Sequence, residues 1–269
     1  MTKFETILVD ADADGIATLT LNRPDKHHAM NARMISELSE AAALLGEDAG
    51  VRAVILAASG PSFCAGGDLE WMRAQQAADR AGKMAEAGRL SAMLAALNAL
   101  PKPLIARVQG NVHGGGVGLV AVSDIAIGAE DITLALTETK LGLIPATIGP
   151  FVVARMGQGM ARQVFFSGTT FGPDFAQRAG LLHEVCASGE LDARVRRHAE
   201  AVLKTAPGAV ASAKALCLSL GDDEAADIRA SITALADRWE SDEARERIRA
   251  FLGRSTMAAR RMDPGNQHG

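Results

Sequence analysis

Two glycine-rich segments contain the residues of this sequence that are best suited to chemistry. The first covers residues 63–69 (FCAGGDL) and the second covers residues 113–119 (HGGGVGL). Each pattern predicts a tight turn that leads into a helix, so that backbone N–H groups stay uncovered where the helix dipole adds positive potential. Two such turns can hold one oxygen anion from two directions, which stabilises charge that develops on a thioester or ester carbonyl.

The surrounding sequence predicts the elements that position these turns. Strands are predicted at residues 7–9, 16–21, 51–57, 104–108, 125–127, 132–136 and 183–186, the first two forming a hairpin. Helices are predicted from Asn31 to about Leu45 and from Arg80 to Leu100, where Pro101 ends the second one. After residue 149 the pattern is almost entirely helical. We therefore expect an α/β core followed by a helical C-terminal extension of the kind that often serves assembly.

Composition excludes several classes of protein. The chain has 269 residues, of which 48% are hydrophobic and 22% charged, as in an ordinary globular domain. The net charge of −4 provides no basic surface for nucleic acid. The longest uncharged run, residues 108–123, contains five glycines and is a poor membrane span, and residues 1–5 show no apolar signal region. The three cysteines lack a CxxC pair, so we expect reduced thiols, a cytoplasmic location and no metal site.

The second turn also resembles the glycine-rich turns of two other protein classes. Residues 116–121 (GVGLVA) fit the GxGxxA pattern of a dinucleotide-binding turn in an NAD-dependent oxidoreductase, with Glu138 twenty residues beyond Gly118. That acid should end the next strand of a βαβ unit, but two short strands are predicted before it. The HGGG run also occurs in lipases, yet the sequence has no Gly-x-Ser-x-Gly elbow. If the glycines served only to allow close helix packing, this would explain the second turn, but the presence of the first glycine turn would then be a coincidence.

Four motifs together resemble the crotonase (enoyl-CoA hydratase/isomerase) superfamily. They are residues 22–24 (NRP), 63–69 (FCAGGDL), 108–116 (VQGNVHGGG) and 123–126 (SDIA). The resemblance runs from about residue 16 to residue 185 and resumes near residues 244–254. It implies a spiral of ββα repeats followed by helices, assembled as a homotrimer or homohexamer. We accordingly expect a spiral core over residues 1–195 and a helical trimerisation region over residues 196–269.

The resemblance also implies catalytic roles. The backbone N–H groups of Gly67 and Gly115 would form the oxyanion hole for a CoA thioester, and glycine permits the close approach that this needs. Ordinary hydratases of this family use two glutamates. Glu138 occupies the position of the second, whereas Gly118 stands at the position of the first. Asp124, the nearest other acid, lies at the start of a predicted strand and is expected to be structural.

Loss of the first acid leaves three kinds of chemistry open. A single carboxylate could serve an isomerase that moves one proton between two carbons, a hydratase, or another acyl-CoA reaction such as decarboxylation. The combined pattern of residues 63–72, 114–119 and 136–145 is similar to bacterial methylglutaconyl-CoA hydratases and to relatives acting on isoprenoid-derived glutaconyl-CoAs. This favours hydration of a branched, carboxylated enoyl-CoA in leucine or isoprenoid breakdown. We expect Gly118 to leave a space that the substrate carboxylate fills in part.

Residues for CoA binding follow from the same resemblance, with CoA as part of the substrate and no separate cofactor. Lys26 is expected to lie near a phosphate, and an ammonium needs only proximity to an anion. The other expected substrate-binding residues are His28, Ala65, Asp68, Leu69, Gly114 and Gly118. Near the C-terminus, Phe251 and Arg254 occupy the positions of an aromatic and a cation that reach CoA in a neighbouring subunit.

Overall fold

Two β-sheets of unequal size form the centre of the molecule. The computed structural model describes residues 3–219 and 224–261 of the 269-residue chain. The larger sheet has six strands in the order β1-β2-β3-β4-β6-β9, and the smaller has three in the order β5-β7-β8. The strands are β1 (Ile7–Ala11), β2 (Ile16–Leu21), β3 (Ala53–Ala58), β4 (Leu104–Val108), β5 (Asn111–His113), β6 (Ile125–Ala129), β7 (Thr133–Ala135), β8 (Thr170–Phe171) and β9 (Glu184–Cys186).

Consecutive strands divide between the two sheets, which produces the predicted spiral. β4 pairs in the larger sheet and β5 in the smaller, and the next pair, β6 and β7, repeats this division. All pairings within the larger sheet are parallel except the β1–β2 hairpin. The expected α/β class and the ββα spiral are therefore confirmed. Two-residue β8 lies in a stretch that the sequence predicted as helical.

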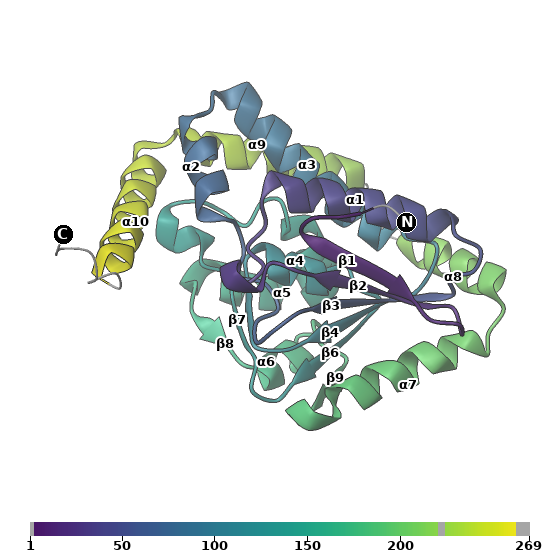
Figure 1. Cartoon of the computed structure of the whole chain (residues 1–269). Coiled ribbons are helices and arrows are strands. Elements are labelled where there is room, and N and C mark those ends of the chain that lie inside the picture. Colours follow the sequence, from purple (N-terminus) through teal and green to yellow (C-terminus); the bar gives the residue numbers. More distant parts are fainter. Residues whose placement is uncertain (1–2, 220–223, 262–269) are drawn as a thin grey trace.

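Helices cover both faces of the larger sheet (Figure 1). They are α1 (Ala32–Glu47), α2 (Leu69–Ala77), α3 (Arg80–Asn98), α4 (Gly115–Ala121), α5 (Gly149–Ser167), α6 (Pro173–Arg178), α7 (Leu191–Leu203), α8 (Pro207–Ser219), α9 (Glu224–Glu240) and α10 (Asp242–Arg261). Three short 3₁₀ helices are η1 (Pro24–Lys26), η2 (Glu138–Leu141) and η3 (Ser188–Glu190). α1 begins as predicted, because the Asn31 side chain accepts a hydrogen bond from the Met34 N–H at 2.9 Å.

The central strand β3 shows why the sheet must be covered. Every one of its six residues (AVILAA) is buried, as expected for a parallel strand with helices on both faces. α1 and α3 lie over one face, and α7 crosses the other face beneath β3, β4 and β6 (Figure 1). The two glycine turns follow the carboxyl ends of β3 and β4, so the sheet brings both to the same edge.

The C-terminal helices form a second, smaller core that we call the satellite cluster. Its buried members are Ala87, Leu143, Ala146, Leu235, Trp239, Ala244, Ile248 and Leu252. The cluster joins α3, α9 and α10 to the segment that follows η2. The predicted boundary between residues 195 and 196 falls inside α7, whose Val195 and Ala199 both belong to the main core. α7 therefore packs with the spiral and not with a separate C-terminal region.

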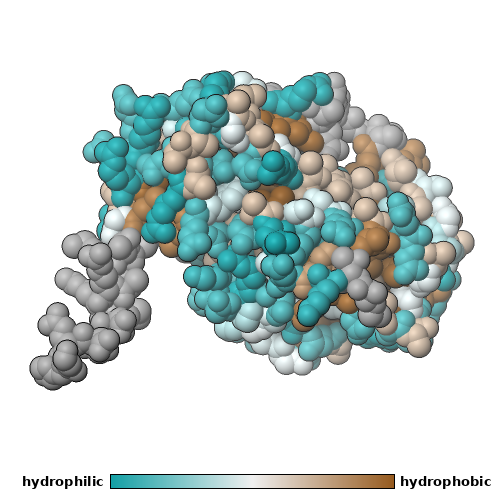
Figure 2. All heavy atoms as spheres, turned by 45° about the horizontal axis from the view of Figure 1, so that its top comes forward, coloured by the Kyte–Doolittle hydropathy of each residue, from teal (hydrophilic) through white to brown (hydrophobic). Residues whose placement is uncertain are grey.

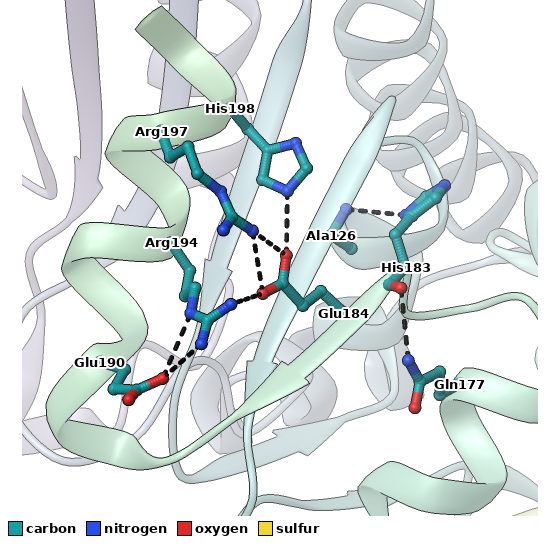
Figure 3. Close-up of polar contacts among 8 residues, drawn as sticks. All are labelled: Ala126, Gln177, His183, Glu184, Glu190, Arg194, Arg197 and His198. Carbon is teal, nitrogen blue, oxygen red and sulfur yellow. Dashed lines mark hydrogen bonds and ion pairs between the residues drawn. The ribbon is translucent and has the colours of Figure 1, made fainter. Parts of the chain in front are cut away.

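A polar network fastens α7 to the last strand of the larger sheet. The Glu184 carboxylate accepts hydrogen bonds from Arg194 at 3.0 Å and Arg197 at 3.1 Å, and it pairs with His198 at 3.0 Å (Figure 3). The hydrogen bond with His198 and the charges of the two arginines hold the pKa of the Glu184 carboxyl below its usual value. The ion pairs lie at the surface and are partly exposed to solvent, so each contributes about 0.2–1 kcal/mol to stability.

The outer surface mixes polar and apolar residues. On the face shown in Figure 2, apolar side chains lie among charged ones. Within the described part of the chain, no single helix is long and apolar enough to cross a bilayer. A bent pair, residues 188–203 with Pro207–Leu218, meets that test by length and composition alone.

Candidate active site

Backbone hydrogen bonds tie the two glycine turns together. The N–H groups of Phe63 and Cys64 both donate to the Asn111 carbonyl at 3.1 Å, and the His113 N–H donates to the Cys64 carbonyl at 2.8 Å. Cys64 and Val112 thereby form a parallel bridge outside the two sheets. Two segments whose bridged residues are 48 positions apart are thus held side by side immediately before their glycines.

Glycines allow the two turns to approach more closely than other residues could. A Cβ atom on Gly114 would lie 3.7 Å from the Gly66 Cα and 3.2 Å from the Oε1 atom of Glu138. Gly66 and Gly114 have φ angles of 91° and 47°, in the region that favours glycine. The glutamate carboxyl and both turns therefore meet at one point.

The amides of Gly67 and Gly115 are available at this point. Gly67 lies opposite Met30, whose N–H donates to the Gly66 carbonyl at 2.7 Å and whose carbonyl accepts from the Asp68 N–H at 2.9 Å. That pairing uses the neighbours of Gly67 and leaves its own N–H unused. Gly115 is the first residue of α4, where helix N–H groups lack intrahelical partners. Neither amide donates to an acceptor among the residues that the structure describes.

Glu138 is the acid of the site. It is the first residue of η2, and its Oε2 atom is buried and lacks a hydrogen-bond partner within residues 3–219 and 224–261. Burial raises the pKa of its carboxyl to about 7, because the charged form loses hydration and a hydrogen bond from its own backbone N–H offsets that loss only in part. An acid with a pKa near neutrality can both accept and donate a proton under ordinary conditions.

Comparison with known proteins agrees with this arrangement. The family model described as enoyl-CoA hydratase/isomerase matches residues 11–258. The chain belongs to the enoyl-CoA hydratase/isomerase family. It is 34% identical over 206 residues to the enoyl-CoA hydratase domain-containing protein 2 of Bos taurus mitochondria, covering 74% of this chain and 69% of that one.

Solved structures show the same fold. The enoyl-CoA hydratase of Shewanella pealeana superposes with a TM-score of 0.79 at 33% identity, covering 94% of this chain and 95% of that one. Pseudomonas aeruginosa AtuE superposes with a TM-score of 0.78 at 35% identity, covering 93% of this chain and 97% of that one.

The dinucleotide-binding interpretation is wrong for this family member. Gly116 and Gly118 lie inside α4 with their Cα atoms against Cys64 and Ile148, where they cannot cradle a pyrophosphate.

The space expected at Gly118 does not exist. A Cβ atom there would come within 2.6 Å of Ile148 Cγ2 and 3.2 Å of Leu94 Cδ1. Gly118 is buried, and these apolar side chains occupy the volume in which a substrate carboxylate was expected. The prediction that Gly118 binds substrate is therefore wrong. Asp124 is structural as predicted, since it accepts from the Leu104 N–H and pairs with Lys214, both at 2.7 Å.

The loop before α1 contains one expected ligand that the structure reassigns. His28 is completely buried. Its Nδ1 accepts from the Arg23 N–H at 3.0 Å, and its Nε2 lies 2.5 Å from the Ser59 carbonyl, to which it donates. Burial lowers the pKa of the imidazole, in agreement with a neutral ring. Both nitrogens are used, so His28 holds the loop in place and does not face CoA.

Asp68 is likewise structural. Its carboxylate caps α2 by accepting from the Glu70 N–H at 2.9 Å, and it pairs with Arg23 at 2.9 Å. These bonds hold the pKa of the Asp68 carboxyl below its usual value although burial opposes them. The side chain contributes to the site by starting the helix directly after Gly67, and a direct role in binding substrate is not supported.

The remaining expected ligands keep their roles as predictions. Lys26, Ala65 and Leu69 are exposed around the first turn, where a CoA chain could reach them. Gly114 donates its N–H to the Ala135 carbonyl at 3.0 Å, so it contributes backbone shape and not a free donor. Phe251 packs at the edge of the satellite cluster of its own chain, and Arg254 is exposed.

Two residues at the site were not predicted. Met30 pairs with the first turn through its backbone, and its side chain lies 3.0 Å from where a Gly115 Cβ would be. Trp71 places its indole 3.6 Å from the corresponding atom of Gly67. An apolar residue ending the polar 22–29 loop was the available signal for Met30. Trp71 stands three positions after Asp68, which caps α2, and this spacing was the available signal that its side chain lies near the first turn.

Proposed function

We propose that this enzyme is an enoyl-CoA hydratase that uses Glu138 as its single protein acid–base residue. The observation that supports this most directly is the Glu138 carboxyl: its buried Oε2 atom has no hydrogen-bond partner among the described residues, and its Oε1 atom lies against the same glycine turn that presents the free amide of Gly115. A polar atom buried without a partner is costly and is retained where chemistry uses it.

The proposed reaction uses the two turns and the acid together. The Gly67 and Gly115 N–H groups receive the thioester oxygen and stabilise the negative charge that forms there, which makes C3 electrophilic. Glu138 as carboxylate takes a proton from water while the water oxygen bonds to C3. The protonated acid then delivers a proton to C2 as the oxyanion collapses to the thioester. Because the pKa of Glu138 is about 7, both proton transfers are accessible near neutral pH.

The proposed substrate is a branched enoyl-CoA with a distal carboxylate, such as 3-methylglutaconyl-CoA or an isoprenoid-derived glutaconyl-CoA, from leucine or isoprenoid breakdown. The support is the resemblance of residues 63–72, 114–119 and 136–145 to that branch. Since Ile148 and Leu94 fill the side of Gly118, the distal carboxylate must bind elsewhere.

Isomerisation is the second candidate, and a specific observation favours it. Apolar atoms surround Gly118, so no second carboxylate stands at the position where two-acid hydratases have one. A single carboxyl suffices to move a proton between C2 and C4.

Isotopes distinguish the two reactions. The purified enzyme is incubated with 3-methylglutaconyl-CoA in H₂¹⁸O, and separately with a 3-enoyl-CoA in D₂O, and the products are analysed by mass spectrometry. A hydratase yields a 3-hydroxyacyl-CoA with ¹⁸O at C3. Conversion of the 3-enoyl-CoA to its 2-enoyl isomer with no ¹⁸O in any product would assign isomerisation and overturn hydration.

We also propose assembly as a homotrimer or homohexamer, located in the cytoplasm. The support for assembly is an exposed apolar face on α5, where Phe166 is 69% exposed and Met160 is 37% exposed. Exposed apolar patches of this kind mark interaction surfaces. Light scattering coupled to gel filtration gives the mass directly. Phe166→Glu should reduce it to that of a monomer.

A further inference from the structure

An indole ring lies against the first glycine turn. Two ring carbons of Trp71 are 3.6 and 3.7 Å from the position that a Cβ atom on Gly67 would take, and Met72 Cγ is also 3.6 Å from it. Gly67 is exposed, and Trp71 and Met72 are each half-buried in the first turns of α2. A thioester that reaches the Gly67 N–H therefore comes close to both of these side chains.

A hydrogen bond on the far side fixes this indole. Its N–H donates to the Oε2 atom of Glu86 on α3 at 3.2 Å, and Arg89 pairs with the Oε1 atom of the same carboxylate. The backbone of Trp71 is held as well, because its N–H donates to the Asp68 side chain that caps α2. A tryptophan N–H needs a partner of this kind when the ring is removed from water, and here the partner also decides where the ring lies.

The helices around Trp71 connect it to the segment that carries the catalytic acid. α10 contacts both α2 and η2, and η2 begins with Glu138 (Figure 1). Ala87, the residue after Glu86, packs in the satellite cluster with Leu143, which follows η2. The indole and the acid therefore belong to one group of packed helices.

The chain before Gly67 leads in another direction, toward the loop that is expected to bind CoA. The Ala65 N–H donates to the His27 carbonyl at 2.9 Å, next to Lys26. The first turn thus has the expected CoA side before Gly67 and has Trp71 after it. Because a thioester joins CoA to the acyl carbons, an oxygen held at Gly67 leaves those carbons on the side of Trp71.

We propose that Trp71 is a specificity-determining residue for the acyl group, with its indole face as one wall of the region that the first acyl carbons occupy. Glu86 is the positioning residue that holds the ring against Gly67. This assignment rests on the proposed function, since it takes Gly67 as an oxyanion donor. It adds the chemistry of the wall: the indole of Trp71 and the thioether of Met72 favour hydrocarbon next to the thioester.

Fluorescence reports on this position directly. The chain has two tryptophans, Trp71 and Trp239, and no tyrosine. Trp239 is buried in the satellite cluster, so Trp239→Phe leaves Trp71 as the one indole, and Trp71→Phe leaves Trp239 as the matched control. Both proteins are titrated with free CoA and with butyryl-CoA, a saturated thioester that cannot be hydrated. Calorimetry measures both affinities, and thermal melting establishes that each variant is folded.

Butyryl-CoA should change the emission of Trp71 beyond the change that free CoA causes, because hydrocarbon replaces water at the ring. The protein that retains only Trp239 should show no such acyl-dependent change. If butyryl-CoA binds and the emission of Trp71 responds no more than it does to free CoA, the assignment is wrong. If the wild type binds neither ligand, the assignment and the proposed function both fail. An acyl-dependent response in a protein that hydrates no enoyl-CoA would support the assignment and refute the proposed function.

Affinities of further variants separate the roles of the two residues. Trp71→Ala should weaken butyryl-CoA binding by about tenfold, the effect of losing apolar contact with about two methylene groups, and leave free CoA within about threefold. Glu86→Leu should show part of this loss, because the ring is released. Glu86→Gln should retain most of the affinity, since its amide oxygen still accepts from the indole N–H. Equal losses for both ligands in Trp71→Ala would show a structural role alone and overturn the assignment, and equal losses in the two Glu86 variants would refute the positioning role.

Discussion

Gly116 and Cys64 lie so close that a Cβ atom on Gly116 would come within 2.8 Å of the Cβ atom of Cys64. Cys64 is completely buried, and burial raises the pKa of its thiol to about 12, so it remains a small neutral packing residue. The spacing of the two amide-bearing turns is therefore fixed by packed atoms before substrate arrives. Donors held in advance need no reorganisation during the reaction.

Glu138→Gln should lower kcat by roughly 10²- to 10⁴-fold, because the amide keeps the size of the side chain and removes its proton chemistry. Steady-state hydration kinetics measure this. In the wild type, kcat/KM should fall as the pH drops below about 7, where the carboxylate becomes protonated. If kcat of the variant falls less than tenfold, or if its kcat/KM still decreases below pH 7, Glu138 does not take part in the proton transfers.

The same substitution should change stability in a pH-dependent way. The carboxyl pKa rises from 4.5 in the unfolded chain to about 7 in the folded one, so the protonated acid favours folding below pH 4.5 and that contribution is lost as the pH rises through 7. At pH 8.5, Glu138→Gln should be more stable than the wild type by up to about 3 kcal/mol. At pH 4, below both pKa values, the two should nearly coincide. Urea unfolding at both pH values provides the comparison, and a constant difference would contradict the burial argument.

Gly115→Pro should remove one oxyanion donor with little harm to α4, since proline is accepted at the first position of a helix. Gly115→Ala is the matched control. It introduces the same Cβ contact with the flexible Met30 side chain, at 3.0 Å, but retains the N–H. Loss of one such donor costs about 3 kcal/mol in the transition state, so kcat should fall at least about 100-fold in the proline variant relative to alanine. Equal activity in the two folded variants would show that the Gly115 N–H is not part of the oxyanion hole.

Gly118→Ala should destabilise the fold by about 1–3 kcal/mol, because the new Cβ meets Ile148 Cγ2 at 2.6 Å. Ile148→Ala removes that methyl group, so the double variant should be more stable than the sum of the single effects by about 1 kcal/mol. Chemical denaturation of all four proteins gives this coupling. Additive losses would show that the two residues do not touch.

His28→Asn should lower the free energy of unfolding by about 1–3 kcal/mol, because the shorter side chain cannot bridge the Arg23 N–H and the Ser59 carbonyl. Asparagine tolerates the φ angle of 55° at this position, so backbone strain is not the cause. His27→Asn, at the exposed neighbour with a φ angle of 47°, is the control. CoA affinity should be unchanged in the folded His28 variant. A selective loss of CoA binding would restore the direct role first expected for it.

Local patterns were enough to predict much of the fold. The Asn31 cap, the β1–β2 hairpin and the start of α4 at Gly115 each depend on residues within a few positions of one another. The roles of His28 and Gly118 depend instead on atoms 31 and 30 positions away, in Ser59 and Ile148. His28 lies in a polar loop and Gly118 has no side chain, so neither position in the sequence indicates which distant residues pack around it. The second turn could be predicted because its glycines act locally on the backbone. The role of Gly118 could not be predicted, because the tertiary fold decides its packing against Ile148.

The satellite cluster has an evolutionary consequence. Its buried residues come mainly from α9, α10 and the segment after Glu138, whereas the two glycine turns are held by Cys64, Met30 and the main sheet. Substitutions in the satellite cluster can therefore accumulate without moving either free amide. The C-terminal helices that pack in the satellite cluster and the turns that hold the two amides can therefore diverge in sequence at different rates.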